Sequence, residues 1–309
     1  MSPLLHTDLP RFVAFGEALT DLICTGLDSW ISRCGGAPWN VARALSTFGE
    51  LSAFGGAISC DVFGQALWQE SMDASLDPRF LQQVERSPLL AVVHEVHPPR
   101  YFFVGDDSAD LHFHPSGLPQ GWRQFVRWAH FGGISLNREP LASRLLELAE
   151  SLKAQGVTIS YDPNYRQGMD NRYDDTLERM ARLADVIKVS DEDLCGLFRS
   201  PSPHVGLGQL AAWNPQAKLL CTHGAQGATL YQGTQEWSAR ALAVEVVDTV
   251  GTGDAAMAGF IHACLHQEPE ETQLRCAVAA GAAACLQAGA RAPSLAEMRA
   301  LAAQVQLVG

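Results

Sequence analysis

The amino-acid sequence predicts an α/β fold with a largely parallel sheet. Short apolar runs bounded by turn residues alternate with longer segments whose apolar residues recur at helical spacing, and this alternation is typical of βα units. The chain has 309 residues, 47% of them hydrophobic, so it can bury one large core. Because no internal repeat, low-complexity tract or long polar linker interrupts it, we expect a single domain over residues 1–309.

The strands of the main sheet are expected in short apolar runs. In chain order these are RFVAFGEAL (11–19), LSAFGGAI (51–58), WAHFGGISL (128–136), GVTISYD (156–162), DVIKVS (185–190), KLLCTHG (218–224) and GATLY (227–231). Helices are expected between them, most clearly over 140–156, which begins with a proline, carries leucines at helical spacing and ends on a glycine. Two further helices, rich in alanine, are expected over 272–289 and 294–307.

Two segments, 20–38 and about 90–116, do not follow this alternation. Both predict strands joined by turns, with no helix between the strands. We expect them to form a small β lid that is inserted in the domain, projects from the main sheet and covers a site. Since open strand edges tend to pair with other strands, we also expect a homodimer that forms through the lid.

The composition excludes several classes of partner. The formal net charge is −12 and no stretch concentrates basic residues, which argues against binding to nucleic acid. No apolar run approaches the roughly 20 residues of a membrane span, and the first residues lack the pattern of a signal peptide. The eight cysteines show no C-x-x-C spacing, as expected of buried thiols in a reducing compartment. We therefore expect a cytoplasmic protein that binds neither nucleic acid nor membrane.

The segment EVVDTVGTGDAAMAGF (245–260) contains the strongest candidate site. A strand is expected over 244–247 and a helix from Ala255 onward, so the intervening turn presents backbone N–H groups at a helix start, where anions bind. The turn consists of Gly251, Thr252 and Gly253. Asp254 beside it can accept a hydroxyl proton. A simple helix cap is the alternative interpretation of this turn taken alone.

The segment VDTVGTGDAAMAGF resembles the carboxy-terminal signature of the ribokinase-like (PfkB-type) sugar kinases. Further blocks resemble family blocks in the same order: FGEALTD (15–21), GGAPWNVA (35–42), DPNYR (162–166) and KVSDEDL (188–194). The resemblance covers nearly the whole chain. It implies a ribokinase-like three-layer αβα fold with a small β-sheet lid. It also implies transfer of the γ-phosphoryl group of ATP to a primary hydroxyl of a sugar, with Asp254 as general base and the turn from Gly251 to Gly253 as anion hole.

The resemblance also implies the residues that bind each substrate. Sugar-binding residues would be Asp21, Gly35, Gly36, Asn40, Phe103 and Arg166. ATP-binding residues would be Ser190, Thr222, Gly224 and Gly227, together with Gly251 and Gly253. Read without the resemblance, the two adjacent glycines form a β-turn, which does not explain Asp21 and Asn40 together. Arg166 is then an ordinary surface arginine and the segment 222–227 a plain hairpin.

Ion binding is implied at two places. Many family members have Asn-x-x-Glu, tied through waters to magnesium, where this chain has Ser190 and Asp193. Asp193 is therefore the expected magnesium residue. Some relatives hold a potassium ion at the positions of Asp248, the Val250 carbonyl and Ser294.

The segment YFFVGDDSADLHFHP (101–115) indicates which sugar is the acceptor. It is similar to the lid strand of fructokinases, although the fructokinase pattern usually carries an arginine where this chain has residues 104–106. Fructose is therefore the expected acceptor. The alternatives are a 2-keto-3-deoxygluconate kinase, a riboside or nucleoside kinase, and a non-catalytic sugar-binding protein. A dehydrogenase is excluded because no G-x-G-x-x-G follows the first expected strand.

Two pairs of histidines show regular spacing. His112 and His114 alternate on an expected lid strand, and His262 and His266 are one helical turn apart. Neither pair has a third ligand nearby in the sequence or the H-E-x-x-H spacing. We therefore interpret these histidines as exposed or capping residues rather than as zinc ligands.

Overall fold

The computed structural model describes residues 9–96 and 99–308. Its main sheet has the strand order β14-β13-β12-β11-β10-β9-β8-β1-β4-β5. Neighbouring strands from β11 to β5 are parallel, whereas β12, β13 and β14 join antiparallel at one edge. The strands span Phe12–Phe15 (β1), Ser52–Ser59 (β4), Leu81–Val84 (β5), Trp128–Gly132 (β8), Thr158–Asp162 (β9), Val186–Ser190 (β10), Lys218–Thr222 (β11), Ala228–Gln232 (β12), Gln235–Ala239 (β13) and Leu307–Val308 (β14). The largely parallel sheet is therefore confirmed.

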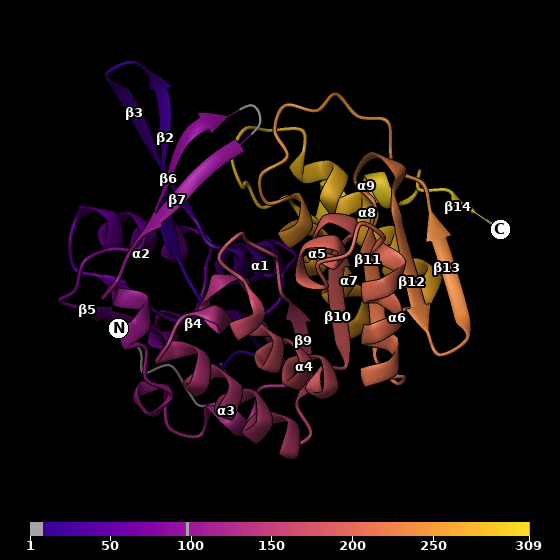
Figure 1. Ribbon diagram of the computed structural model, residues 1–309, viewed down its shortest axis with the longest axis horizontal. Helices are drawn as coiled ribbons and strands as arrows, with labels where there is room; N and C mark the ends of the chain where they lie inside the picture. Colours follow the sequence, from indigo (N-terminus) through magenta and orange to yellow (C-terminus); the bar gives the residue numbers. More distant parts are fainter. Residues whose placement is uncertain (1–8, 97–98, 309) are drawn as a thin grey trace.

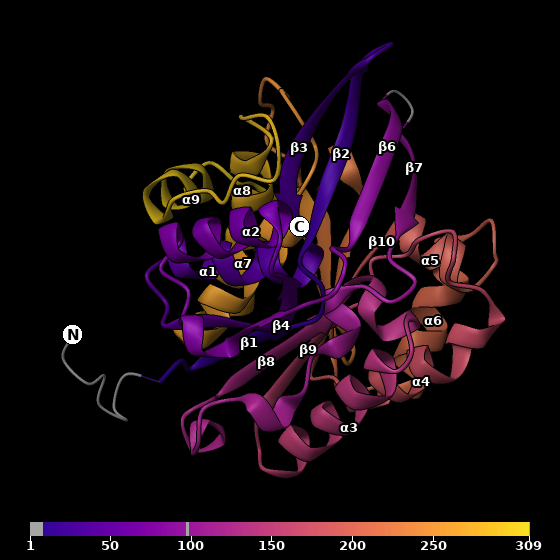
Figure 2. The same cartoon turned by 90° about the vertical axis from the view of Figure 1, so that its left-hand side faces the viewer.

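Helices cover both faces of this sheet and produce three layers (Figure 1). Figure 2 shows one group of helices on each side. One face carries Ala37–Thr47 (α1), Val62–Asp73 (α2), Thr252–Leu265 (α7), Glu270–Ala284 (α8) and Leu295–Ala302 (α9). The other carries Leu141–Ala154 (α3), Asp174–Leu183 (α4), Asp191–Leu197 (α5) and Pro203–Trp213 (α6). Successive side chains of a strand point to opposite faces, so Phe12 belongs to the core beneath α7 and Val13 to the core beneath α3.

A second sheet of four strands projects from the main sheet (Figure 1). Its order is β3-β2-β6-β7, with two antiparallel hairpins joined through parallel pairing of β2 and β6. These strands span Leu19–Gly26 (β2), Ser29–Gly35 (β3), Leu90–Val96 (β6) and Pro99–Val104 (β7). The expected lid segments are longer than the strands, because 36–38 lead into α1 and 105–116 contain turns and short 3-10 helices. Residues 97 and 98 of the lid segment, and residues 1–8 at the chain start, lie outside the described residues.

Each of the expected apolar runs contains a strand, and the helix expected over 140–156 is α3. Three other predictions were wrong. His112 does not lie on a lid strand, because it ends the 3-10 helix Ala109–His112. Residues 244–247 form no strand, and Val246 and Val247 are 57% and 59% exposed. The helix expected over 294–307 ends at Ala302, and the chain then forms β14. In place of strand pairing, the Val247 N–H donates to the Cys285 carbonyl at the end of α8. The last residues of the chain leave the helix and pair with the end of β13 as β14.

All eight cysteines are free thiols. The expectation that they are buried holds for Cys221, Cys276 and Cys285 and is wrong for Cys60, which is exposed, while the other four are partly buried. In the part of the chain that the structure describes, no helix combines the length and apolar character needed to span a bilayer.

Candidate active site

The turn that begins α7 has the backbone geometry of an anion site. The helix begins at Thr252, earlier than the expected start at Ala255. Gly251 is the N-cap with φ +76°, and a Cβ there would lie 2.8 Å from a neighbouring alanine Cβ, so glycine is required. Within the described residues, the N–H groups of Gly253 and Asp254 donate to no protein acceptor, as is usual in the first turn of a helix. These groups are available to an anionic ligand.

Asp254 is buried at this helix start, with an exposed fraction of 7%. Asn40, near the beginning of α1, donates a hydrogen bond from Nδ2 to Asp254 Oδ2 over 2.8 Å. Burial raises the pKa of Asp254, and the Asn40 hydrogen bond together with two nearby positive charges opposes the rise without cancelling it. The two charges belong to Lys188 and Arg166. A carboxylate with a raised pKa accepts a proton more readily, so this geometry suits a general base.

Lys188 is a buried cation beside the turn that the sequence analysis did not identify. Its Nζ lies 3.0 Å from Asp162 Oδ2, and both side chains are at most 5% exposed. A Cβ added to Gly253 would lie 2.9 Å from the same Nζ, so the ammonium group is adjacent to the backbone of this turn. Burial by itself lowers the pKa of Lys188, but the surrounding carboxylates raise it more. The lysine therefore stays charged. A lysine in the apolar run VIKVS was the available signal.

Asp21 and Arg166 approach the site from the lid strand β2 and from the loop after β9. Burial raises the pKa of Asp21 to about 6, and the charge of Arg166 opposes this rise. Because Arg166 acts electrostatically on Asp21 and on Asp254, the structure brings these three side chains into one region. Arg166 Nη1 is fixed by the carbonyl and side-chain oxygens of Asn164.

The two glycines at the end of β3 permit a close approach of the backbone. A Cβ at Gly35 would lie 2.6 Å from Asp21 Oδ2. Gly36 has φ +118°, and a Cβ there would lie 2.4 Å from the Glu17 carbonyl oxygen, so no larger residue fits. Phe103 lies on β7, in register with Ala91 of β6 and through it with Asp21 of β2. It is 36% exposed and contacts Tyr101 edge to face.

The expected nucleotide residues lie at the carboxyl ends of two neighbouring strands. Ser190 of β10 and Thr222 of β11 are register partners, at the edge of a parallel sheet where ligands bind. Gly224 and Gly227 have φ values of +53° and +115° and shape the turn from β11 to β12. This turn joins two antiparallel strands, β11 and β12. It therefore is a hairpin, as the alternative interpretation of the segment 222–227 expected.

The residues expected to bind ions also fix local backbone. Asp193 Oδ1 accepts a hydrogen bond from the Tyr165 N–H and Oδ2 accepts one from the Ser190 N–H, over 2.8 and 2.7 Å. Asp248 accepts from the N–H groups of Val250 and Gly289. Ser294 is the N-cap of α9 and accepts from the Glu297 N–H. Their ion-binding roles stay predictions.

A buried carboxylate, Glu17, was also missed by the sequence analysis. Its Oε2 accepts a hydrogen bond from Ser135 Oγ over 2.5 Å. Burial raises its pKa to about 7. It connects the segment after β1 to the segment after β8, beside the turn that holds Gly36. We assign it a structural role, because its oxygens contact protein donors rather than the region around Asp254.

The sequence and the fold are similar to those of known carbohydrate kinases. The sequence model of the family described as "pfkB family carbohydrate kinase" matches residues 10–297. A fructokinase from Klebsiella pneumoniae is 33% identical over 256 residues, which cover 80% of this chain and 81% of that protein. A crystal structure of fructokinase with bound ATP from Xylella fastidiosa superimposes with a TM-score of 0.86 at 26% identity, covering 96% of this chain and 99% of the other. A crystal structure of a Vibrio cholerae fructokinase in a fructose, ADP and calcium-bound form superimposes with a TM-score of 0.83 at 29% identity. The match covers 95% of this chain and 99% of the other.

Proposed function

The chain belongs to the pfkB family of carbohydrate kinases and has the ribokinase-like fold, and from that premise we propose that it phosphorylates fructose with ATP. The γ-phosphoryl group of ATP would pass to a primary hydroxyl of the sugar. The observation that carries the proposal is the buried Asp254 carboxylate. It lies next to N–H groups at the start of α7 that have no acceptor among the described residues.

Asp254 is the proposed general base. Its pKa is raised by burial, so the carboxylate takes a proton from the attacking hydroxyl more readily than an exposed aspartate does. Asn40 holds one carboxylate oxygen through its amide, which leaves the other oxygen to face the hydroxyl. Proton removal then accompanies attack of the sugar oxygen on the γ-phosphorus.

The turn from Gly251 to Gly253, through Thr252, is the proposed anion hole. Phosphoryl transfer depends mainly on positioning and on stabilising charge that spreads over the phosphoryl oxygens. The free N–H groups of the first turn and the positive end of α7 supply that stabilisation. The Lys188 ammonium next to Gly253 adds a full positive charge at the same place.

ATP is proposed to lie along the carboxyl ends of β10 and β11, at Ser190, Thr222, Gly224 and Gly227. Magnesium bound with the phosphates supplies charge neutralisation. Asp193 is the residue proposed to hold its water ligands, because each of its oxygens accepts one backbone hydrogen bond and retains a lone pair. A potassium site is proposed at Asp248, the Val250 carbonyl and Ser294 by similarity to the family alone.

The sugar is proposed to lie between the lid and α7, in contact with Asp21, Gly35, Gly36, Asn40, Phe103 and Arg166. Asn40 supports this placement because its buried Oδ1 has no hydrogen-bond partner within the described structure. A buried acceptor without a donor is costly, and a sugar hydroxyl would supply the donor.

A homodimer through the lid is part of the proposal. The lid strands expose large apolar side chains: Trp30, Ile31, Phe102 and Val104 are between 40% and 52% exposed. Apolar groups on open strands favour a partner that covers them. Sedimentation at micromolar protein should give the mass of two chains, and a monomer would contradict this part.

The experiment that tests the activity is ADP release from ATP and magnesium in the presence of single sugars. The panel contains fructose, ribose, 2-keto-3-deoxygluconate, other hexoses and nucleosides. We expect turnover with fructose. Turnover only with another acceptor would keep the kinase and replace the sugar. Sugar binding by calorimetry without ADP release from any acceptor would instead support a non-catalytic sugar-binding protein.

A further inference from the structure

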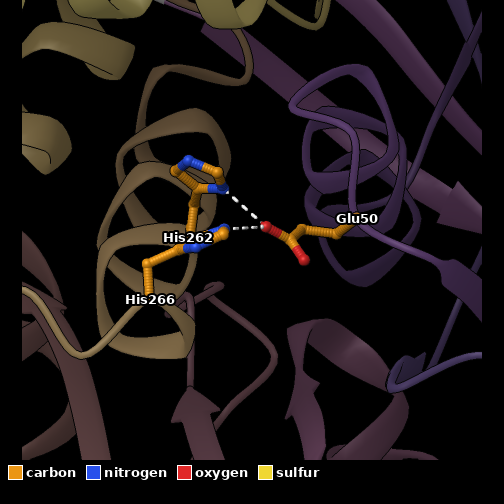
Figure 3. A group of neighbouring side chains, drawn as sticks. All are labelled: Glu50, His262 and His266. Atoms are coloured by element: carbon orange, nitrogen blue, oxygen red, sulfur yellow. Dashed lines mark hydrogen bonds and ion pairs between the residues drawn. The ribbon is translucent and has the colours of Figure 1, made fainter.

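Three side chains of residue types that commonly bind metals converge at the end of α7 that is opposite to Asp254. His262 and His266 project from one face of the last turns of the helix toward Glu50, which lies between α1 and β4 (Figure 3). Glu50 Oε1 lies 2.7 Å from His262 Nδ1 and 2.8 Å from His266 Nε2. The three ligand atoms all lie within 4.8 Å of one another. The interpretation of this histidine pair as lacking a third ligand is therefore wrong, because the fold supplies one from 212 residues away.

The donor set is that of a zinc-type site. Two imidazole nitrogens and one carboxylate oxygen bind Zn²⁺ at about 2.0–2.2 Å, usually in a tetrahedron completed by water or another ligand. These bond lengths place neighbouring donor atoms about 3.3 Å apart. The two nitrogen-to-oxygen distances would therefore lengthen by roughly half an ångström when an ion entered. Magnesium and calcium prefer oxygen donors, so this set favours a transition metal.

The residues around the site allow the distances between Glu50 and the histidines to lengthen on the side of His266. The His262 side chain is 8% exposed, and the Phe48 ring contacts it edge to face at 5.6 Å between centroids, so its orientation is fixed. The His266 side chain is 55% exposed and is free to rotate outward. This exposed side leaves room for water as a further ligand.

The charge balance also favours a cation. Within the described residues, Glu50 forms ion pairs with the two histidines and with no lysine or arginine. With neutral imidazoles the cluster carries one negative charge, in a chain of net charge −12. Among the described residues, no lysine or arginine side chain competes with an incoming metal ion for this carboxylate.

We propose that Glu50, His262 and His266 form a binding site for one divalent transition metal ion of the zinc class. The ion joins the end of α7 to the segment after α1, and so holds together the two helices that carry Asp254 and Asn40 at their other ends. With about 1.5 Å of rise per residue, the eight positions from Asp254 to His262 separate this site from the catalytic turn by about 12 Å. None of its three residues belongs to the proposed magnesium or potassium positions.

The test is titration of the metal-free full-length protein with Zn²⁺ by calorimetry, without ATP. We expect one strongly bound ion per chain. His266→Ala and Glu50→Gln should each lower the affinity at least about tenfold, which is the effect that loss of even a ligand's supporting hydrogen bond has. His112→Ala is the matched control, because His112 pairs with a single carboxylate, that of Asp107. This variant should bind zinc as the unmodified protein does.

A second measurement separates this site from the thiols. Cys60 is the exposed cysteine, so the titration is repeated with Cys60→Ser, which should keep the tight ion. Zinc should also raise the Tm of the unmodified protein and of Cys60→Ser, and this rise should disappear in His266→Ala. Absence of tight binding, or tight binding that persists in both His266→Ala and Glu50→Gln, would overturn the proposal.

Discussion

A carboxylate lies at each end of the helix pair α1 and α7, and its surroundings shift its pKa in opposite directions at the two ends. The helices contact each other along their length and run in the same direction. At their amino ends Asn40 binds Asp254, and at their carboxyl ends Glu50 binds two imidazoles. Burial acts to raise the carboxyl pKa at both places, but the pKa of Asp254 is raised whereas that of Glu50 is lowered.

The difference lies in burial and in the partners. Asp254 is deeply buried, and one amide with two more distant charges does not compensate for its lost hydration. The Glu50 side chain is only partly buried, with 18% exposed, and the hydrogen bonds and charges of two imidazoles together outweigh its desolvation. We interpret Asp254 as the reactive carboxylate and Glu50 as a structural one. The following substitutions should separate these two roles.

The largest effect is expected from Asp254→Asn at the amino end. The amide cannot accept the hydroxyl proton, so kcat should fall by about 10²–10⁴-fold, the usual contribution of a general base. ATP binding, measured by calorimetry, should stay close to normal because the backbone turn is unchanged. Turnover near the unmodified level would remove Asp254 from the mechanism.

Lys188→Met should be the most destabilising change near the same end. Methionine fills the space of the lysine stem but leaves the buried Asp162 without its ion-pair partner. Breaking one side of a buried pair costs about 3–5 kcal/mol in the free energy of unfolding. Urea unfolding measures this cost. The double variant with Asp162→Asn should recover part of the loss, and a failure to recover would show that the pair is not the cause.

Asn40→Ala should have a smaller effect and should shift the pH profile. Loss of a hydrogen bond to a charged group costs about 1.5–3 kcal/mol, so kcat should fall by about tenfold to a hundredfold. The Asn40 bond lowers the pKa of Asp254, hence its removal should raise that pKa further. The pKa of Asp254 is already above the ordinary aspartate value of about 3.9. The pH at which kcat/KM falls on the acid side should therefore move to a higher value. A shift to lower pH would contradict this assignment.

Glu50→Gln at the carboxyl end should affect stability and leave catalysis intact. Replacing the carboxylate by an amide weakens two hydrogen bonds to imidazoles at a partly exposed site, which costs about 1 kcal/mol. Urea unfolding of metal-free protein measures it, and kcat should be unchanged. A loss of kcat comparable to that of Asn40→Ala would show that the two ends are coupled rather than independent.

The sequence was sufficient for features that local pattern determines. The parallel strands, α3 and the turn at Gly251 follow from residues next to one another in the chain. The pairs that define the two helix ends join residues 214 and 212 positions apart, and no local spacing reveals such contacts. The absent strand at 244–247 has a similar origin, because the Val247 N–H donates to a residue distant in the sequence, Cys285, rather than to a neighbouring strand.

The most direct test of the central claim is identification of the product by ³¹P NMR after incubation with fructose, ATP and magnesium. We predict a sugar phosphate on a primary hydroxyl, in amounts equal to the ADP formed, with the unmodified protein and with Glu50→Gln, and very little with Asp254→Asn. Release of inorganic phosphate without a sugar phosphate, or equal product from the Asp254→Asn protein, would contradict phosphoryl transfer with Asp254 as its base.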